Sequence, residues 1–216
     1  MKEEPEGRVD GGRREVAEGR VEIRVAKPID IKYVYPILKE MEASAKARGT
    51  GIGKRSPQAL CQKIYEGKAV IALGEYGEWA GFSYIEAWGN GEYVSNSGLI
   101  VNPVYRRAGI ARAIKEEIFL LSRRKYPKAK IFSITTGAAV MKLNHDFGFR
   151  PVPYAEVTRD EKFWDQCRNC VNHAILESQG RQRCLCTAML FSPDSVEEQR
   201  SQRISRREPK MVVAMA

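Results

Sequence analysis

The alternation of hydrophobic and polar residues predicts an α/β domain that begins with a strand and a helix. Val21 to Val25 alternates with a period of two, which is typical of a strand with one buried face. A helical stretch follows from Pro28 and Asp30 to about Ala47. The expected buried face of this helix consists of Ile31, Tyr35, Leu38 and Met41.

A second, shorter helix is predicted after a glycine-rich loop from Gly49 to Gly53. Ser56 is suited to cap its N-terminus and Pro57 to occupy its first position, and it ends near Tyr65. Three strand-like runs follow, at 68–73, 79–88 and 93–101. Short glycine-containing turns separate them, which predicts an antiparallel meander.

A long helix and a further strand–helix–strand unit complete the pattern. From Arg107 to Tyr126 the apolar residues fall on one helix face. They are Ile110, Ile114, Ile118 and Leu121. A strand is then expected at 130–135, a helix at 138–147, and an exit through Gly148 into a strand at 152–154. The mixture of strands and helices indicates an α/β (α+β) fold.

Composition indicates one domain, residues 21–191, between two disordered tails at 1–20 and 192–216. The formal net charge is +9. Because the charges within each tail nearly cancel, the excess lies on the folded part and favours an anionic ligand. The beginning of the chain lacks the apolar run of a signal peptide, which favours a cytoplasmic protein with no membrane partner and with cysteines present as thiols or metal ligands.

The most informative window is the loop between the strand ending at Val101 and the long helix. Small residues at Ala108, Gly109 and Ala111 permit close approach of a ligand to the backbone. The free N–H groups and positive dipole end of the helix favour a pyrophosphate, and Arg106 adds charge. The alternative is an ordinary basic loop before a surface helix.

This window resembles motif A of the GCN5-related N-acetyltransferases (GNAT), written Arg/Gln-x-x-Gly-x-Gly/Ala. A Val-x-Pro at Val101 to Pro103 precedes it and a Gly-Phe at Gly148 follows it. The resemblance covers residues 21–154. It implies a mostly antiparallel sheet split between strands 4 and 5, helices on both faces, and an acyl-coenzyme A donor. The implied coenzyme A contacts are Leu99, Ile100, Val101, Arg106, Arg107, Ala108, Gly109, Ile110, Ala111 and Asn144.

Three further segments, at 54–56, 130–136 and 179–183, resemble the acetyltransferase domain of the N-acetylglutamate synthases. That resemblance implies transfer of an acetyl or succinyl group to the α-amine of glutamate, the first step of arginine biosynthesis. Guanidinium groups bind carboxylates in a bidentate manner. The implied substrate residues are Arg55, Thr135, Thr136 and Arg181. The alternative interpretation makes both arginines solvated surface residues and both threonines plain strand residues.

Two positions depart from the usual GNAT pattern. Ser95 stands where the family often has a glutamate base, and Asn144 stands where it often has a tyrosine acid. Neither side chain titrates near neutral pH. We therefore expect direct attack of the amine on the thioester, with deprotonation through water by Glu92 or Glu86. Tyr154 and His145 are the candidate donors to the leaving thiolate.

Four cysteines form two close pairs in a predicted Cys-rich hairpin at 160–190. They are Cys167, Cys170, Cys184 and Cys186. Four soft ligands in two pairs predict a structural zinc site, in which His173 could replace one thiol. Redox disulfides and simply buried thiols are the alternatives. Phe163 and Trp164 are expected to anchor the segment.

Two rival functions remain. A protein, peptide or other small-amine acetyltransferase would share the fold, although the basic core fits an anionic acceptor better than a cationic one. A zinc-knuckle nucleic-acid-binding module would need exposed aromatic residues among lysines and arginines. Here Tyr76 and Trp79 lie beside acidic residues instead. The favoured partner is thus a small amine, nucleic acid is disfavoured, and a homodimer is compatible with the sequence.

Overall fold

The structure is a computed structural model that describes residues 20–49, 55–193 and 212–214. Most of both predicted tails lies outside these residues. So do positions 50–53 of the glycine-rich loop, and Lys54 after it. The strands are β1 (Arg20–Val25), β2 (Ala69–Leu73), β3 (Trp79–Trp88), β4 (Tyr93–Val101), β5 (Lys130–Thr135), β6 (Arg150–Val152), β7 (Thr187–Phe191) and β8 (Val212–Ala214). The helices are α1 (Val34–Arg48), α2 (Pro57–Tyr65), α3 (Ile110–Lys125), α4 (Ala138–Asp146), α5 (Glu161–Asp165) and α6 (His173–Ser178).

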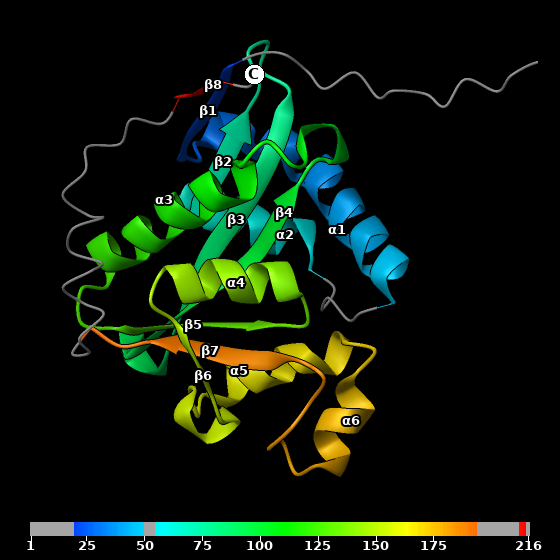
Figure 1. The fold of residues 1–216 in the computed structure, drawn as a ribbon, viewed down its shortest axis with the longest axis vertical. Helices are drawn as coiled ribbons and strands as arrows, with labels where there is room; N and C mark the ends of the chain where they lie inside the picture. Colours follow the sequence, from blue (N-terminus) through cyan, green and yellow to red (C-terminus); the bar gives the residue numbers. More distant parts are fainter. Residues whose placement is uncertain (1–19, 50–54, 194–211, 215–216) are drawn as a thin grey trace, which may run out of the picture.

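The strands form one sheet in the order β6-β7-β5-β4-β3-β2-β1-β8 (Figure 1). Neighbouring strands are antiparallel except β4 and β5, which run parallel. The predicted meander of β2, β3 and β4 is confirmed. The short strand β8 pairs with β1, with Val21 opposite Val213. It lies within the segment where the sequence pattern predicts a tail.

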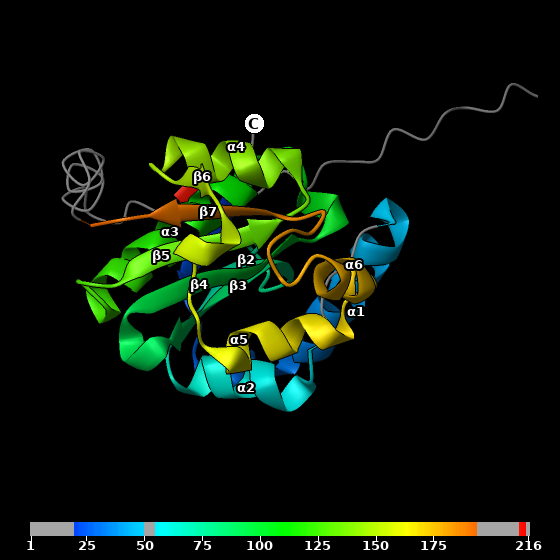
Figure 2. The same cartoon turned by 90° about the horizontal axis from the view of Figure 1, so that it is seen from below.

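Helices cover both faces of the sheet. Figure 2 shows α4 on one side of the strands and α2 and α5 on the other. α3 packs on the first face through Ile110, Ile114 and Ile118, as its periodicity predicts. α1 and α2 pack on the second face against β2 and β3. Two covered faces explain why β2 is buried at every residue.

The buried face of α1 agrees with the expected one except at Tyr35, since Met41 is buried and Ile31 and Leu38 pack against the same core. Val34, Ile37 and Met41 are buried, whereas Tyr35 is 73% exposed. Residues Pro28–Tyr33 form a 3₁₀ turn before the α-helix. Since a 3₁₀ turn has 3.0 residues per turn and not 3.6, the four-residue step from Ile31, which lies in this turn, does not bring Tyr35 to the buried face.

The start of α3 also differs. The predicted helix begins at Arg107, but α3 begins at Ile110. Arg107 and Gly109 have φ values of 70° and 76°. Left-handed residues cannot continue a right-handed helix, so the loop keeps an irregular shape up to Gly109.

The Cys-rich segment, defined here as residues 161–186, is helical, so the predicted hairpin is wrong. It contains α5, a 3₁₀ turn at Gln166–Asn169, and α6. Asp160 caps α5 by accepting a hydrogen bond from the Lys162 N–H at 3.0 Å. The chain then enters β7, which lies between β5 and β6. The spacing of the first cysteine pair fits a short helix as well as a hairpin, and the pair lies at the 3₁₀ turn that follows α5.

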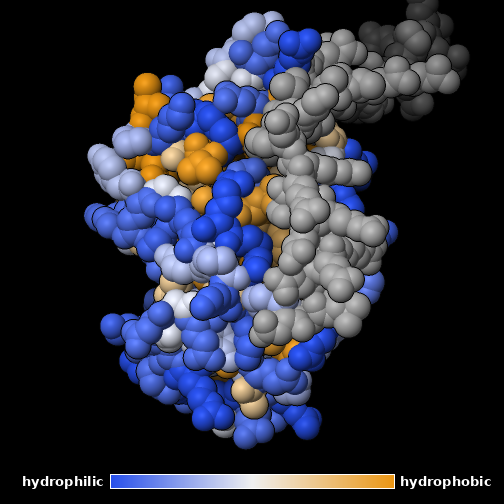
Figure 3. Space-filling model, turned by 90° about the vertical axis from the view of Figure 1, so that its left-hand side faces the viewer, coloured by the Kyte–Doolittle hydropathy of each residue, from blue (hydrophilic) through white to orange (hydrophobic). Residues whose placement is uncertain are grey.

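In the described part of the chain, no helix is both long and apolar enough to cross a membrane. The face shown in Figure 3 is mainly hydrophilic, with hydrophobic residues gathered in its upper part.

Candidate active site

The sheet opens between β4 and β5. The two strands pair only where residues 93–95 lie opposite residues 130–132. Beyond Ser95, β4 continues to Val101, whereas β5 follows its antiparallel partner β7. Figure 1 shows β5 and β7 running across the direction of β3 and β4. The predicted split is therefore confirmed, and the edge of β4 that faces β5 carries backbone groups that this pairing leaves unused.

A β-bulge shapes β4 beside the opening. The register with β3 shifts between Phe82 and Tyr84, and Gly98 has a φ of 66°. A Cβ atom at Gly98 would lie 2.7 Å from Cε1 of Tyr84. Both the backbone conformation and the close packing therefore require glycine. A bulge re-aims the backbone groups of its strand, and this one lies on the strand that borders the split.

The N-terminus of α3 follows directly from β4. Its N-cap residue is Gly109, so no side chain caps the helix, and its first turn contains no acidic residue. A Cβ atom at Gly109 would meet nothing within 4 Å. Glycine is thus required there by the φ of 76° and not by packing. The arrangement leaves the N–H groups and positive dipole end of a 16-residue helix facing open space.

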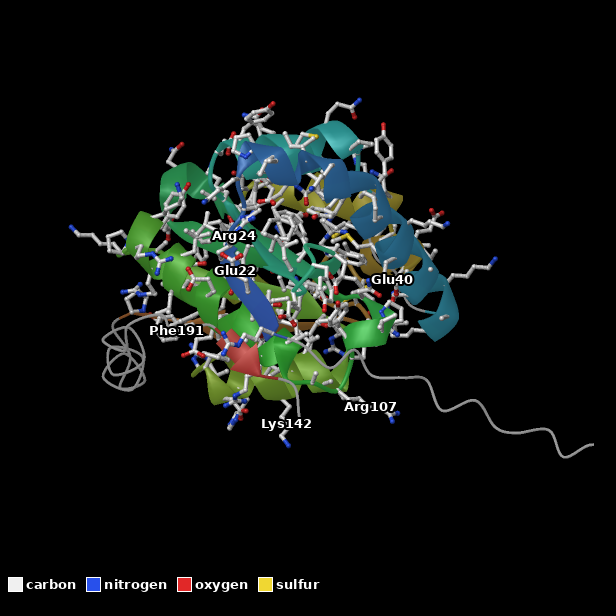
Figure 4. The ribbon with its side chains drawn as sticks, turned by 90° about the horizontal axis from the view of Figure 1, so that it is seen from above. Glu22, Arg24, Glu40, Arg107, Lys142 and Phe191 are labelled. Atoms are coloured by element: carbon white, nitrogen blue, oxygen red, sulfur yellow. The ribbon has the colours of Figure 1, made fainter. Side chains whose placement is uncertain are left out.

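The two arginines of this loop have different surroundings. Arg106 reaches α1, where its Nη2 lies 2.6 Å from Oε1 of Glu40 and 2.9 Å from Oγ of Ser44. Arg107 is exposed, and Figure 4 shows it projecting outward on the same side as Lys142 of α4. The charge offered to an anion therefore comes from Arg107 and Lys142 more than from Arg106, whose predicted role is shared with an ion pair to α1.

The strand residues of the predicted donor site lie along the free part of β4. Leu99 and Val101 are half-buried and pack toward α3, whereas Ile100 is buried toward α1 and α2. Ala108 and Ala111 are also only half-buried, at the entrance to α3. These residues are therefore brought together with Gly109, as the sequence pattern predicts.

α3 and α4 meet on the same face of the split. Arg112 of α3 pairs with Asp146 of α4 at 2.6 Å, and this pairing lowers the pKa of Asp146. Asn144 of α4 is fully buried, and its Nδ2 lies 3.7 Å from Sδ of Met189. Its Oδ1 is buried without a hydrogen-bond partner. At 0% exposure the Asn144 side chain has no access to solvent, so the predicted coenzyme A contact through it has no opening in this structure.

Lys115 is a buried cation that the sequence analysis does not single out. It is 3% exposed, and its Nζ lies 2.9 Å from Oδ1 of Asn96 and 4.3 Å from the ring centroid of Phe149. Burial lowers its pKa to about 7. Because a lysine beside an apolar helix face is normally solvated, only the packing of β4 and Phe149 around α3 reveals it.

The comparisons with known proteins agree with this geometry. No protein-family model and no curated protein matches the sequence. The structure is similar to N-acetylglutamate synthase from Neisseria gonorrhoeae complexed with coenzyme A and N-acetyl-glutamate, with a TM-score of 0.57 and 16% identity over 80% of this chain and 35% of that chain. It is also similar to a Mycobacterium tuberculosis protein in complex with CoA, with a TM-score of 0.57 and 18% identity over 79% of this chain and 98% of that one.

A third similar structure is a GNAT superfamily phosphinothricin acetyltransferase from Sinorhizobium meliloti in complex with AcCoA, with a TM-score of 0.54 and 15% identity over 80% of this chain and 88% of that one. The chain has the GNAT fold. It spans about a third of the length of the Neisseria gonorrhoeae synthase. At these identities the likeness shows the fold alone.

The predicted catalytic residues of this GNAT fold occupy different parts of the split. Ser95 is buried at its closed end, where its Oγ accepts a hydrogen bond from Nε1 of Trp88 at 2.9 Å. Glu86 lies opposite Ser95 on β3 and pairs with Lys63 of α2. Glu92 is exposed and precedes the paired end of β4. The split opens in the other direction, so Glu92 lies at its closed end, whereas Glu86 lies on β3 opposite Ser95.

The two candidate proton donors, Tyr154 and His145, lie in different surroundings. The Tyr154 hydroxyl donates to the Cys186 carbonyl oxygen at 2.8 Å, and burial raises the pKa of this tyrosine. His145 is exposed on α4. Tyr154 is therefore committed to the Cys-rich segment, and the prediction that it protonates the thiolate loses its geometric basis.

Of the predicted substrate residues, Arg55 lies closest to the bulge. Its Nε lies 2.5 Å from the Tyr84 hydroxyl, and Tyr84 is paired with Ser97. Thr135 ends β5, and its Oγ1 accepts a hydrogen bond from the Gly137 N–H at 3.0 Å. Thr136 follows it and is half-buried. The two threonines thus lie at the open end of β5, whereas Arg55 contacts Tyr84 of β3.

Arg181 lies elsewhere. Its guanidinium lies 2.7 Å from Oε2 of Glu161 and 3.1 Å from Oε1 of Glu177, and both carboxylates raise its pKa. The residue therefore joins α5 to α6. With two carboxylate partners already present, Arg181 braces the Cys-rich segment, in place of the predicted contact with a substrate carboxylate.

The four clustered cysteines converge on one cavity. This cavity has a volume of about 40 Å³ and is lined by Ile134, Tyr154, Trp164, Cys167, Cys170, Asn172, His173, Leu176, Cys184 and Cys186. All four are free thiols. Burial, together with the neighbouring cysteines, raises the pKa of Cys167 to about 11 and of Cys186 to about 12. Phe163 and Trp164 anchor the segment on Trp88 and Tyr154, as predicted.

Proposed function

We propose that this chain is an N-acyltransferase that transfers an acyl group from acetyl-coenzyme A, or succinyl-coenzyme A, to an amine. The observation that carries the proposal is the uncapped N-terminus of α3 beside the open edge of β4. The amides from Arg107 to Ala111 would bind the pyrophosphate of the donor, and the free part of β4 would pair with its pantetheine arm. Both anchors lead the thioester into the split.

In the proposed reaction, the amine attacks the thioester carbonyl carbon directly. The carbonyl oxygen would then become an oxyanion, which the backbone amides re-aimed by the bulge at Gly98 would stabilise. The amine proton would pass through water to Glu86, the carboxylate opposite Ser95. Collapse of the intermediate breaks the carbon–sulfur bond and releases the coenzyme A thiolate.

The acceptor in this proposal is an amino acid, with glutamate favoured. Arg55 supports a carboxylate-bearing acceptor because it is held on the face of the sheet that carries Glu86 and beside the bulge of β4. The Neisseria gonorrhoeae synthase with the same fold was solved with N-acetyl-glutamate. Transfer to glutamate would form the first intermediate of arginine biosynthesis.

The four cysteines have no step in this transfer, and zinc bound by them would be structural. Free thiols are typical of a reducing compartment, so a cytoplasmic location belongs to the same proposal.

A thiol-release assay tests the proposed function. The purified protein is incubated with acetyl- or succinyl-coenzyme A and one amine at a time: glutamate, other amino acids, a peptide and a polyamine. Release that depends on glutamate, with N-acylglutamate identified by mass spectrometry, is the expected result. Release with peptide or polyamine alone would replace the acceptor and keep the reaction class. If no amine accelerates release, the proposed function is wrong.

A further inference from the structure

Two segments of the chain bring four sulfur atoms to one place. Cys167 and Cys170 come from the 3₁₀ turn after α5 and its end, whereas Cys184 and Cys186 come from the stretch that enters β7. Figure 1 shows α5, α6 and β7 gathered at one end of the molecule. All four side chains line the cavity of about 40 Å³. Since one probe-sized water needs about 10–15 Å³, the space is large enough for a single ion.

Backbone groups position two of the sulfurs. The Asn172 N–H donates to Sγ of Cys170 at 3.4 Å. The thiol of Cys184 donates to the carbonyl oxygen of Asn172 at 3.9 Å. One residue thus links the two cysteine pairs, with each sulfur held toward the shared cavity.

The Cys-rich segment has little else to hold it together. α5 and α6 contain 5 and 6 residues, which is too short for stable helices in isolation. Its buried apolar side chains are Phe163, Trp164 and Leu176, while Val171 is 78% and Leu185 64% exposed. A segment with so small a core normally needs a covalent or metal cross-link.

The side chains as they stand do not form a closed metal site: in residues 20–49, 55–193 and 212–214, no three histidine, cysteine or acidic side chains are close enough to hold an ion. Neutral thiols have no electrostatic reason to approach one another. A bound cation supplies that reason, because it converts each thiol into a thiolate ligand. Rotation of the cysteine side chains about the shared cavity is the movement that closure requires.

We propose that Cys167, Cys170, Cys184 and Cys186 bind one zinc ion as four thiolates and thereby fasten α5 and α6 to β7. Binding releases one proton from each thiol to solvent and transfers no electron. Formation of disulfides would need an oxidant, whereas zinc binding needs none.

Metal analysis of the full-length protein tests the proposal. The protein is expressed with zinc in the medium and purified under reducing conditions without chelator. About one zinc per chain, released as a mercurial reagent titrates the thiols, is the expected result. Five titratable thiols with no metal would overturn the proposal, and so would a disulfide in the unreduced protein.

Matched variants assign the ligands. Cys170→Ser and Cys184→Ser, one from each pair, should lose zinc. Cys61→Ser, in α2, is the control and should retain it. His173→Ala should also retain it, although His173 lines the cavity. Loss of zinc from His173→Ala would overturn the four-thiolate ligand set, and retention in both cysteine variants would overturn the site.

A spectroscopic readout guards against variants that fail to fold. The wild-type protein is stripped of metal under reducing conditions and refilled with Co²⁺. Strong sulfur-to-cobalt charge-transfer absorption, with visible bands of a tetrahedral ion, is expected. A spectrum of an octahedral ion without sulfur ligands would overturn the proposal. None of these measurements depends on acyl transfer, so the two proposals can fail separately.

Discussion

Arg55 and Tyr84 meet at the bulge of β4, with Nε of Arg55 2.5 Å from the tyrosine hydroxyl and its guanidinium carbon 5.7 Å from the centre of the ring. Tyr84 in turn packs so closely on Gly98 that no Cβ fits there. A charged side chain is thus held by β3 beside the bulge of the neighbouring strand β4. This relationship is the strongest structural support for an acceptor that carries a carboxylate.

Substitution of Arg55 should weaken acceptor binding. Arg55→Ala should raise KM for glutamate about 10-fold or more, because hydrogen bonds to charged groups contribute roughly 1.5–3 kcal/mol. KM for the donor should stay within about twofold of wild type, on the same energy scale. Steady-state kinetics with Arg48→Ala, an exposed arginine at the end of α1, provide the control. An unchanged KM for glutamate in Arg55→Ala would remove Arg55 from the site.

Substitution of Gly109 should weaken donor binding. Gly109→Ala forces a Cβ into a left-handed residue and distorts the amides that face the pyrophosphate, so Kd for coenzyme A should rise about 10-fold or more, the equivalent of ~1.4 kcal/mol. Isothermal titration calorimetry measures it. Gly49→Ala is the matched control, since Gly49 has a φ of 59° and equally open surroundings at the end of α1. Equal losses in both variants would indicate general destabilisation.

Glu86 and Glu92 should differ in catalysis. Glu86→Gln removes the carboxylate opposite Ser95 and should lower kcat by about 100-fold, the lower end of general-base effects. Glu92→Gln should leave kcat unchanged, because Glu92 lies at the closed end of the split. A pH–rate profile separates the base from a structural role: loss of its acidic limb only in Glu86→Gln identifies the base. The reverse result would restore the relay from Glu92.

Lys115 should make the stability of the protein depend on pH. Its pKa is about 7 in the folded protein and about 10.4 when unfolded. Between these values the unfolded chain binds the extra proton, so stability falls as pH decreases toward 7 and the penalty is constant below it. The slope from this group is at most about 1.4 kcal/mol per pH unit.

Lys115→Met should remove that slope. Urea denaturation at pH 7 and pH 9.5 should show a smaller difference for the variant than for wild type, with the gain in stability larger at pH 7. Lys125→Met is the control, because Lys125 ends α3 and its exposed Nζ donates to the Glu66 carbonyl oxygen at 3.2 Å. A wild-type difference that persists in Lys115→Met would mean that another group causes it.

Local sequence patterns determined most of the fold. Alternating or continuous apolar runs located β1 to β5, and Ser56 and Pro57 located the start of α2, because caps and strand patterns depend on residues close in the chain. The same holds for the loop at Gly109, whose left-handed conformation only glycine adopts readily. The donor side of the candidate site was therefore accessible from the sequence.

The acceptor side was decided by tertiary packing. Which carboxylate faces the split depends on the register of β3 with β4 and on where β4 leaves β5, and Glu86 and Glu92 are equally acidic in the sequence. The resemblance of residues 179–183 to the synthases predicts a substrate contact for Arg181, yet Glu161, twenty residues away, engages it. The burial of Lys115 likewise arises from strands and loops distant in the chain. Contacts between segments far apart carry no local signal, so the sequence by itself determined the elements and the donor loop, and the packing of those elements decided which side chains face the split.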